Sequence, residues 1–377
     1  MRLLVLYQAD DPATDHPGYY DGFERLVYEG KLAMHRGLGY VGIARREGWQ
    51  AVWDKACAAA KEMKADAIFL HFFHVSMPDP SGGIRRLKQL PGRPIVFCSL
   101  GDPYGRWTRR VPRAFQSASA LCDLTFLTGM GYLAQQLISN GSQNLVLMPH
   151  GCCQVRFAAP PPEPAKQPEF DVLFVGNRMQ SRDPLSHFYW VAKKRVAFVE
   201  ALTNCYGPRF GLFGKGWEGN ASWQGYAPFL QQQQIYQRSA VVLGGTPNAY
   251  YDFYASDRPF IAAASGVPLV DYHVPGVERL LEPGRDWWLA HNVKETVGLC
   301  DELLQLSLEA RHAIAGVSRA RILAEHTQYS RCREMTSIVS DVQTARRQGG
   351  TAPRPELSFL RQATGGSLAE PVMAWVS

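Results

Sequence analysis

The chain has 377 residues, 46% of them hydrophobic and 20% charged, and its 40 basic and 34 acidic residues give a net charge of +6. This composition is that of a globular protein of two domains and excludes a wholly disordered or fibrous chain. The mild, scattered positive excess suits a small anionic ligand or a peripheral contact with a membrane surface, and it is too weak to indicate nucleic acid.

Three further features predict a cytoplasmic protein. No run of about 18 apolar residues occurs, so no membrane span is expected. The apolar stretch at residues 3–7 is too short for a signal peptide and is typical of a first buried strand. Eight cysteines are scattered along the chain, apart from the adjacent Cys152 and Cys153, and none forms a Cys-x-x-Cys pair, which indicates reduced thiols rather than a metal site.

The first half of the chain alternates apolar runs with amphipathic segments. We expect strands near residues 2–7, 67–73, 94–99, 124–127 and 145–148, helices near 50–64, 112–120 and 129–139, and a break or turn at 37–42. Such alternation predicts a parallel sheet with helices on both faces.

A proline-rich segment then divides the chain. Residues 160–164 contain four prolines, which favour an extended, semi-rigid connector. The predicted units are an N-terminal domain at 1–158, a linker at 159–168, a C-terminal domain at 169–335, and a C-terminal helix and tail at 336–377.

The second half repeats the pattern of the first. We expect strands near 171–175, 210–213, 240–244, 267–270 and 286–289, and helices near 190–203, 227–237, 258–264, 275–281, 294–305 and 308–325. From about Gln348 the chain is rich in Gly, Pro, Ser and Thr, which predicts a flexible or loosely docked tail. The fold class is therefore predicted as α/β, with two Rossmann-like doubly wound parallel-sheet domains that face a cleft. Ligands of such sheets bind beyond the carboxyl ends of the strands.

Two strands of the second half run into glycine turns that carry cations. The candidate residues are Gly176, Asn177, Arg178 and Arg182 after the first strand, and Gly214, Lys215 and Trp217 after the second. Glycine permits close backbone approach, Arg and Lys bind phosphate, and an aromatic ring can flank a base or sugar. The pattern predicts a diphosphate-binding site; solvated cations beside ordinary turns and a core Trp are the alternative.

A third cation starts the predicted helix at 258–264. Ser256 or Asp257 suits the N-cap position. Arg258 opposes the helix dipole there, which indicates an anionic partner.

The acceptor-side candidates lie in the first half. Asp102 follows a buried strand, where it could accept a proton or orient a hydroxyl, although an Asp-Pro turn also explains it. His71 and His74 point to opposite faces of a strand and are a poor metal pair, but one of them can face the cleft. His16, in the loop after the first strand, is another candidate.

An ordered set of motifs resembles a known family. The segments are 122–128, 140–141, 146–151 and Phe157 in the first half, and 174–178, 213–217, 258–266, 276–284 and 325–327 in the second. The first set, with Pro149-His150-Gly151, resembles the end of the N-terminal domain of GT-B glycosyltransferases. The second set is similar to the bacterial spore-maturation (CgeB-like) glycosyltransferases, and the resemblance covers about residues 95–335.

The resemblance implies that the second domain binds a UDP-, GDP- or dTDP-linked sugar, and that Gly176, Arg178, Lys215, Trp217 and Arg258 line the donor pocket. The acceptor would bind the first domain near Asp102. Neither metal nor cofactor is expected, because cationic side chains and helix N-termini stabilise the leaving diphosphate.

The chain departs from the family at two positions. Retaining members usually carry glutamates where this chain has Phe253 and Ile261, and these carboxylates hold ribose or sugar hydroxyls. Either Asp252 or Asp257 substitutes for them, or the donor is held differently, or the activity is lost.

We therefore predict a metal-independent hexosyltransferase that moves a sugar from a nucleoside diphosphate to a hydroxyl acceptor: a glycan, a lipid-linked sugar, a protein or a small metabolite. Asp102, His16 or His74 would be the base or the acceptor-orienting group. The alternatives are a non-catalytic sugar-nucleotide-binding or partner subunit on the same fold, and a sugar-nucleotide epimerase.

Overall fold

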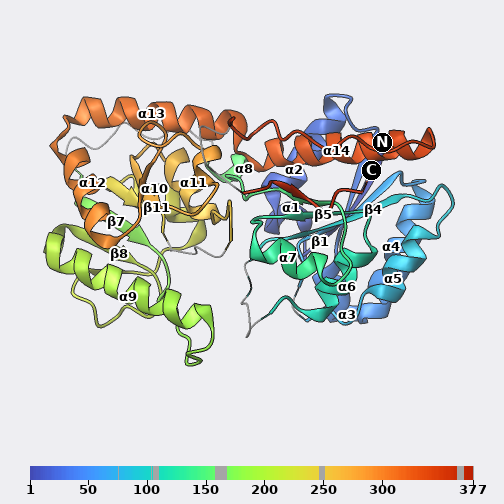
Figure 1. Cartoon of the computed structure of the whole chain (residues 1–377), viewed down its shortest axis with the longest axis horizontal. Helices are drawn as coiled ribbons and strands as arrows, with labels where there is room; N and C mark the ends of the chain where they lie inside the picture. The colour runs from blue at the N-terminus through green and yellow to red at the C-terminus, as the bar shows by residue number, and fades with distance from the viewer. Residues whose placement is uncertain are drawn as a thin grey trace.

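The computed structural model describes residues 1–74, 76–102, 104, 110–157, 168–245, 251–362 and 369–376. These residues form two α/β domains that lie side by side along the long axis of the molecule (Figure 1). The predicted pair of parallel-sheet domains is confirmed. Almost all of the predicted linker 159–168 lies outside the described residues.

A seven-stranded sheet forms the centre of the first domain. Its strand order is β13-β6-β5-β4-β3-β1-β2, and every neighbouring pair is parallel except β13 with β6. The strands are β1 (Arg2–Tyr7), β2 (Met34–Gly39), β3 (Ala67–His71), β4 (Ile95–Leu100), β5 (Leu124–Leu127), β6 (Leu145–Leu147) and β13 (Val372–Met373). Every residue of β3, β4 and β5 is buried, as expected for strands that helices cover on both faces.

The helices of this domain follow the strands in alternation. They are α1 (Pro12–Asp15), α2 (Pro17–Tyr28), α3 (Tyr40–Glu47), α4 (Trp49–Glu62), α5 (Ser81–Lys88), α6 (Arg113–Leu121), α7 (Tyr132–Ile138) and α8 (Gln154–Phe157). The expected break at 37–42 is wrong, because strand β2 passes directly into α3 there. Gly37 allows close packing rather than a turn: a Cβ at this position would stand 3.0 Å from the Tyr7 ring.

A six-stranded sheet, parallel throughout, forms the centre of the second domain. Its order is β12-β11-β10-β7-β8-β9. The strands are β7 (Phe170–Val175), β8 (Phe210–Phe213), β9 (Trp223–Gly225), β10 (Ser239–Leu243), β11 (Leu269–Tyr272) and β12 (Trp288–Ala290). The helices are α9 (His187–Tyr206), α10 (Gln232–Tyr236), α11 (Asp257–Ala264), α12 (Val293–Gln305) and α13 (Leu308–Glu325). Short 3-10 turns occupy Gly207–Arg209, Phe229–Gln231 and Val277–Arg279, the last within the helix expected at 275–281.

Helix α14 (Gln328–Arg347) joins the two domains. Figure 1 shows α13 along the second domain and α14 along the first, one after the other on the same side of the molecule. Helix α14 packs on α2, where the Tyr329 hydroxyl donates to Glu29 at 2.7 Å. It begins within the range 169–335 that the sequence assigns to the second domain, so the chain returns to the first domain earlier than its composition suggests.

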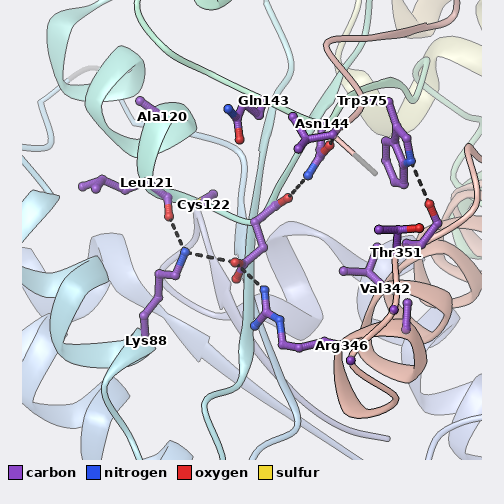
Figure 2. A pocket seen from close by; sticks show the side chains of 16 residues that line it. Lys88, Ala120, Leu121, Cys122, Gln143, Asn144, Val342, Arg346, Thr351 and Trp375 are labelled. Carbon is purple, nitrogen blue, oxygen red and sulfur yellow. Dashed lines mark hydrogen bonds and ion pairs between the residues drawn. The ribbon is translucent and has the colours of Figure 1, made fainter.

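The tail is docked, contrary to the expectation of a loose segment. Strand β13 extends the first sheet beyond β6, and the N–H of Leu147 donates to the carbonyl of Pro371 at 2.8 Å. A hollow of about 550 Å³ lies where α14 and the tail meet the first domain, and Figure 2 shows the side chains that line it. Lys88 and Arg346 both pair with Asp123 there, at 2.9 and 2.7 Å. Asp123 thus links α5 of the first domain to α14, so the hollow is a structural junction.

Candidate functional site

The strand order of the second sheet marks where a ligand binds. The chain runs from β7 outward through β8 to β9, then returns to β10 on the other side of β7. A crevice opens at such a reversal, outside the carboxyl ends of the two strands where the order changes direction. The loops after β7 and β10 therefore border the candidate donor site.

The loops after β7 and β8 are hydrogen-bonded to each other. The N–H of Arg178 donates to the Lys215 carbonyl at 2.9 Å, and the N–H of Lys215 donates to Asn177 Oδ1 at 2.9 Å. Gly214 has φ +136°, and a Cβ there would stand 2.5 Å from the Gly176 carbonyl oxygen. Only glycine allows this close approach, so the two predicted glycine turns form one unit.

Trp217 lies beneath these loops. Its ring is 4% exposed and its Nε1–H donates to the Gly176 carbonyl at 2.7 Å. The sequence interpretation of Trp217 as the wall beside a base or sugar therefore gives way to a positioning role. The alternative given by the sequence, a Trp that packs in the core, agrees with this burial.

Three cations border this unit. Arg178 lies 5.7 Å from the Trp217 ring centre, and Lys215 lies 5.0 Å from that of Tyr226. Arg258 comes from the first turn of α11, and its Nη1 is 3.1 Å from the position that a Cβ on Gly176 would take.

These cations lack acidic partners. Within the part of the chain that the structure describes, none of Arg178, Lys215, Arg258 and the exposed Arg182 forms an ion pair. At the opposite, amino end of the same sheet, Arg209 pairs with Asp171 and Arg238 with Glu169, each at 2.6 Å. Unpaired cations at the carboxyl ends of the strands attract an anion.

Arg195 adds buried positive charge, a feature that the sequence did not single out. It is 5% exposed, and its Nη1 donates to the Asn177 carbonyl at 2.8 Å. Burial, together with the nearby charge of Arg258, lowers the pKa of Arg195 to about 9. It lies in the third turn of α9, and the apolar periodicity of this helix did not distinguish its buried residues from its exposed ones.

The two acidic candidates of this domain are Asp252 and Asp257, and neither forms an ion pair with a cation among the described residues. Asp252 faces the first domain: its carbonyl accepts the N–H of Met130 at 2.7 Å, and a Cβ on Gly131 would stand 2.9 Å from its carboxylate. Asp257 is the first residue of α11, adjacent to Arg258. Phe253 and Ile261, at the two glutamate positions, are 0% and 1% exposed and belong to the core.

The first sheet has its own reversal of strand order, between β1 and β3. His16 and His71 meet there, with ring centres 4.8 Å apart. His16 Nε2 lies 3.0 Å from the Gln8 carbonyl, so this nitrogen carries the hydrogen and Nδ1 is left as an acceptor. Burial lowers the pKa of His16, and His71, fully buried, has its pKa lowered well below the usual range. Both rings are therefore neutral at pH 7.

Asp102 is exposed just beyond β4 and lies near both domains. Its carboxylate adds to the effect of burial in raising the pKa of Tyr254, a residue of the second domain. His150, which the sequence analysis passed over as a site residue, holds the neighbouring Gly101 carbonyl through Nε2 at 2.8 Å. A Cβ on Gly129 would stand 3.0 Å from Tyr254, so the two candidate half-sites adjoin.

His74 is separate from this cluster. Its backbone N–H donates to the Tyr40 hydroxyl at 2.9 Å, and its Nδ1 lies 2.6 Å from the Ser76 hydroxyl. The structure therefore brings together His16, His71 and Asp102 with His150 at the carboxyl ends of the strands, and it leaves His74 bound to its own loop.

Among the described residues, no group of three or more His, Cys, Asp or Glu side chains is placed to hold a metal ion. None of the described helices combines the length and the hydrophobicity that crossing a membrane requires.

Comparison with known proteins matches residues 194–337 to the family described as "Glycosyl transferase-like". No protein of curated function matches the sequence. The fold is similar to that of Anabaena HepE in complex with UDP and glucose, with 13% identity and a TM-score of 0.57 over 90% of this chain and 99% of that one.

Two further solved structures are similar over both domains. For sucrose-phosphate synthase from Thermosynechococcus elongatus the identity is 11% and the TM-score 0.60, over 92% of this chain and 100% of that one. For the E. coli trehalose-6-phosphate protein bound with UDP-2-fluoro glucose the values are 11% and 0.56, over 91% and 99%. Residues 194–337, less than half of the chain, are therefore similar to a glycosyl transferase-like domain, and the two-domain fold is that of the GT-B proteins to which it is similar.

Proposed function

We propose that the protein transfers a hexosyl or related sugar from a nucleoside diphosphate, bound by the second domain, to a hydroxyl group of an acceptor bound by the first. The observation that carries this proposal is that Arg178, Lys215 and Arg258 all border the joined loops after β7 and β8, without ion-pair partners among the described residues. A diphosphate supplies the missing negative charge.

Two of the similar structures hold a uridine nucleotide: HepE holds UDP with glucose, and the E. coli protein holds UDP-2-fluoro glucose. Uridine diphosphate sugars are therefore the first donors to test here, ahead of GDP and dTDP sugars. Within the fold, the ordered motifs of the second domain support a place near the spore-maturation glycosyltransferases.

The cations would act as the glycosidic bond breaks. Negative charge grows on the leaving diphosphate, and fixed cations stabilise the transition state more than the ground state. The N-terminus of α11, which carries Arg258, adds its dipole in the same direction. We expect this arrangement to need no metal ion or cofactor.

The acceptor hydroxyl loses a proton during transfer. Asp102 is the group we assign to receive or orient it, because it is exposed beyond β4 and lies near Tyr254 of the donor domain. His16 is the second candidate, since its neutral ring keeps Nδ1 as a proton acceptor.

The test is a thermal-shift screen with UDP, GDP, dTDP, CMP and their common sugars, without metal. A ligand that binds only the native state raises the melting temperature by mass action. We expect one nucleotide to do so, and Arg258→Ala and Lys215→Ala to reduce its effect while Lys294→Ala, on an exposed position of α12, does not. No shift with any nucleotide, or shifts unaffected by the first two variants, would contradict the proposal.

One observation favours a non-catalytic sugar-nucleotide-binding subunit as the second candidate. Phe253 and Ile261, where related enzymes carry carboxylates, are core residues. Binding of a sugar nucleotide with neither transfer to a broad acceptor panel nor slow hydrolysis would favour this reading over catalysis.

A further inference from the structure

A carboxylate that the sequence analysis did not consider lies beside the proposed donor site. Asp271 belongs to β11, the neighbour of β10 in the sheet, and its side chain extends over two glycines at the carboxyl end of β10. A Cβ on Gly244 would stand 2.6 Å from Asp271 Cγ, and one on Gly245 would stand 2.7 Å from Oδ1. Any larger residue at either position would displace the carboxylate, so the two glycines leave the space that the Asp271 side chain occupies.

This carboxylate has few partners inside the protein. Oδ1 accepts the N–H of Tyr272 at 2.8 Å, and the described residues supply no second hydrogen bond and no ion pair. Burial raises the pKa of Asp271 to about 7, with Tyr272 N–H and the charge of Arg258 opposing that rise. A half-buried carboxylate with a single hydrogen-bond donor is poorly satisfied in the folded protein, and a ligand that donates a second hydrogen bond would stabilise it.

The space in front of Asp271 has the size of one small polar group. A cavity of about 30 Å³ lies there, enough for a single water-sized group and too small for a ring. Its lining includes Gly244, Tyr254, Ser256, Arg258, Asp271 and Tyr272. A hydroxyl group has both the size for this cavity and the O–H donor that the carboxylate lacks.

We propose that Asp271 accepts a hydrogen bond from a hydroxyl group of the bound nucleotide sugar, and so takes the role of the carboxylates absent at Phe253 and Ile261. The proposal rests on the proposed function. Arg258 connects the two: it lines the same cavity, and its guanidinium reaches Gly176 at the diphosphate loop. The hydroxyl therefore belongs to a group attached directly to the diphosphate, which is either the ribose or the transferred sugar.

The other acidic candidates fit this role less well. Asp252 lies against Gly131 of the first domain, and Asp257, although next to Arg258 in the chain, is not among the residues that line the cavity. Asp271 is the acidic residue of that lining, and its strand β11 is the neighbour of β10, which borders the switch point where the sheet topology places a ligand.

The experiment compares Asp271→Asn and Asp271→Ala with wild type by calorimetric titration at pH 8, using whichever of UDP, GDP and dTDP binds wild type and its glucose conjugate. Asp341→Asn, at an exposed position of α14, is the matched control. We expect Asp271→Ala to weaken binding roughly 10- to 100-fold, the range for a hydrogen bond to a charged group, and Asp271→Asn to weaken it less. Loss with the free nucleotide assigns the hydroxyl to the ribose, and loss confined to the glucose conjugate assigns it to the sugar.

The melting temperature separates a ligand-binding role from a structural one. Asp271→Asn removes a poorly solvated charge, so we expect its melting temperature without ligand to equal or exceed that of wild type. Unchanged affinity in both variants would overturn the inference and leave the proposed function intact, and so would a lower melting temperature for Asp271→Asn. Failure of wild type to bind any of the nucleotides would overturn both.

Discussion

The guanidinium of Arg258 reaches across the donor domain to Gly176: its Nη1 is 3.1 Å from the position that a Cβ at residue 176 would occupy. On the other side, the same Cβ would stand 2.7 Å from Cζ of Phe174, a ring in the core. The missing side chain at Gly176 is what lets a cation from the start of α11 approach the loop after β7.

Gly176→Ala tests this relationship. We expect the added methyl group to push Arg258 away and to weaken nucleoside-diphosphate binding about tenfold, while the contact with Phe174 lowers stability by about 1 kcal/mol. Titration calorimetry and urea unfolding measure the two effects. Gly219→Ala, at a position where a Cβ meets open space, is the control, and wild-type affinity in a folded Gly176→Ala variant would contradict the expectation.

Arg178 and Lys215 give a second prediction. Each lacks an ion-pair partner in the described chain, so alanine at either position should remove about 1.5–3 kcal/mol of binding to a diphosphate. Because Lys215 is exposed, added salt should screen its contribution. The measurement is nucleotide affinity at 0.05 M and 0.5 M salt; a Lys215→Ala variant that keeps the full salt dependence of wild type would show that Lys215 does not meet the ligand.

Arg331 stabilises the segment where the chain passes from the second domain back to the first. It is fully buried, and its Nε donates to the Pro149 carbonyl at 2.9 Å while its Nη1 donates to the Glu325 carbonyl at 3.1 Å. Arg331→Met would leave these carbonyls without donors and should lower the free energy of unfolding by about 3 kcal/mol. Urea unfolding checks this, with the exposed neighbour Arg333→Met as control. Equal losses in the two variants would show that the buried hydrogen bonds contribute little.

The buried ring of His71 predicts that the protein loses stability as the pH is lowered. Burial lowers its pKa well below the usual value, and the charges of His16 and His150 lower it further, so the native ring stays neutral while the unfolded ring takes up a proton near pH 6.5. The unfolded state thus binds more protons as the pH falls, and at pH 5.5 this single group costs about 1.4 kcal/mol of stability.

The measurement is urea unfolding of wild type and His71→Phe at pH 7.5 and 5.5. The variant keeps a ring among Tyr7, Tyr19 and Phe69, and it should lose less stability than wild type on acidification. His16 and His326 also have lowered pKa values and act in the same direction, so a residual pH dependence remains. The same loss in His71→Phe as in wild type would show that the buried ring is not the cause.

The docked tail gives the fifth prediction. Deletion of residues 369–377 removes β13, exposes the edge of β6 and abolishes the burial of Val372, which is 2% exposed. The loss of that side chain alone should cost about 2 kcal/mol, and the open edge should promote self-association. Thermal unfolding and light scattering measure these effects, with deletion of residues 376–377 as control; an unchanged melting temperature would mean that the strand adds nothing to stability.

The local pattern of apolar and turn residues was enough to predict many of the strands and helices of this fold. The strands at 124–127 and 210–213 and the helix at 308–325 have the boundaries that their sequences predict, because apolar runs and amphipathic segments bounded by turn residues mark strands and helices locally. The same reasoning failed at residues 37–42, where glycine serves close packing under Tyr7, and at the tail, whose strand forms by pairing with β6. Pairing partners that are more than 200 residues away leave no local signal.

The sequence by itself determined that the chain forms two α/β domains, that glycines and cations follow the strands of the second, and that carboxylates are missing at Phe253 and Ile261. Only the tertiary structure decided which of these residues meet. It placed Arg258 over Gly176, buried Trp217 beneath the loops, turned Asp252 toward the first domain and set Asp271 in a cavity over Gly244. The order of strands in a sheet decides such neighbours, and that order follows from the packing of the whole chain rather than from any local segment.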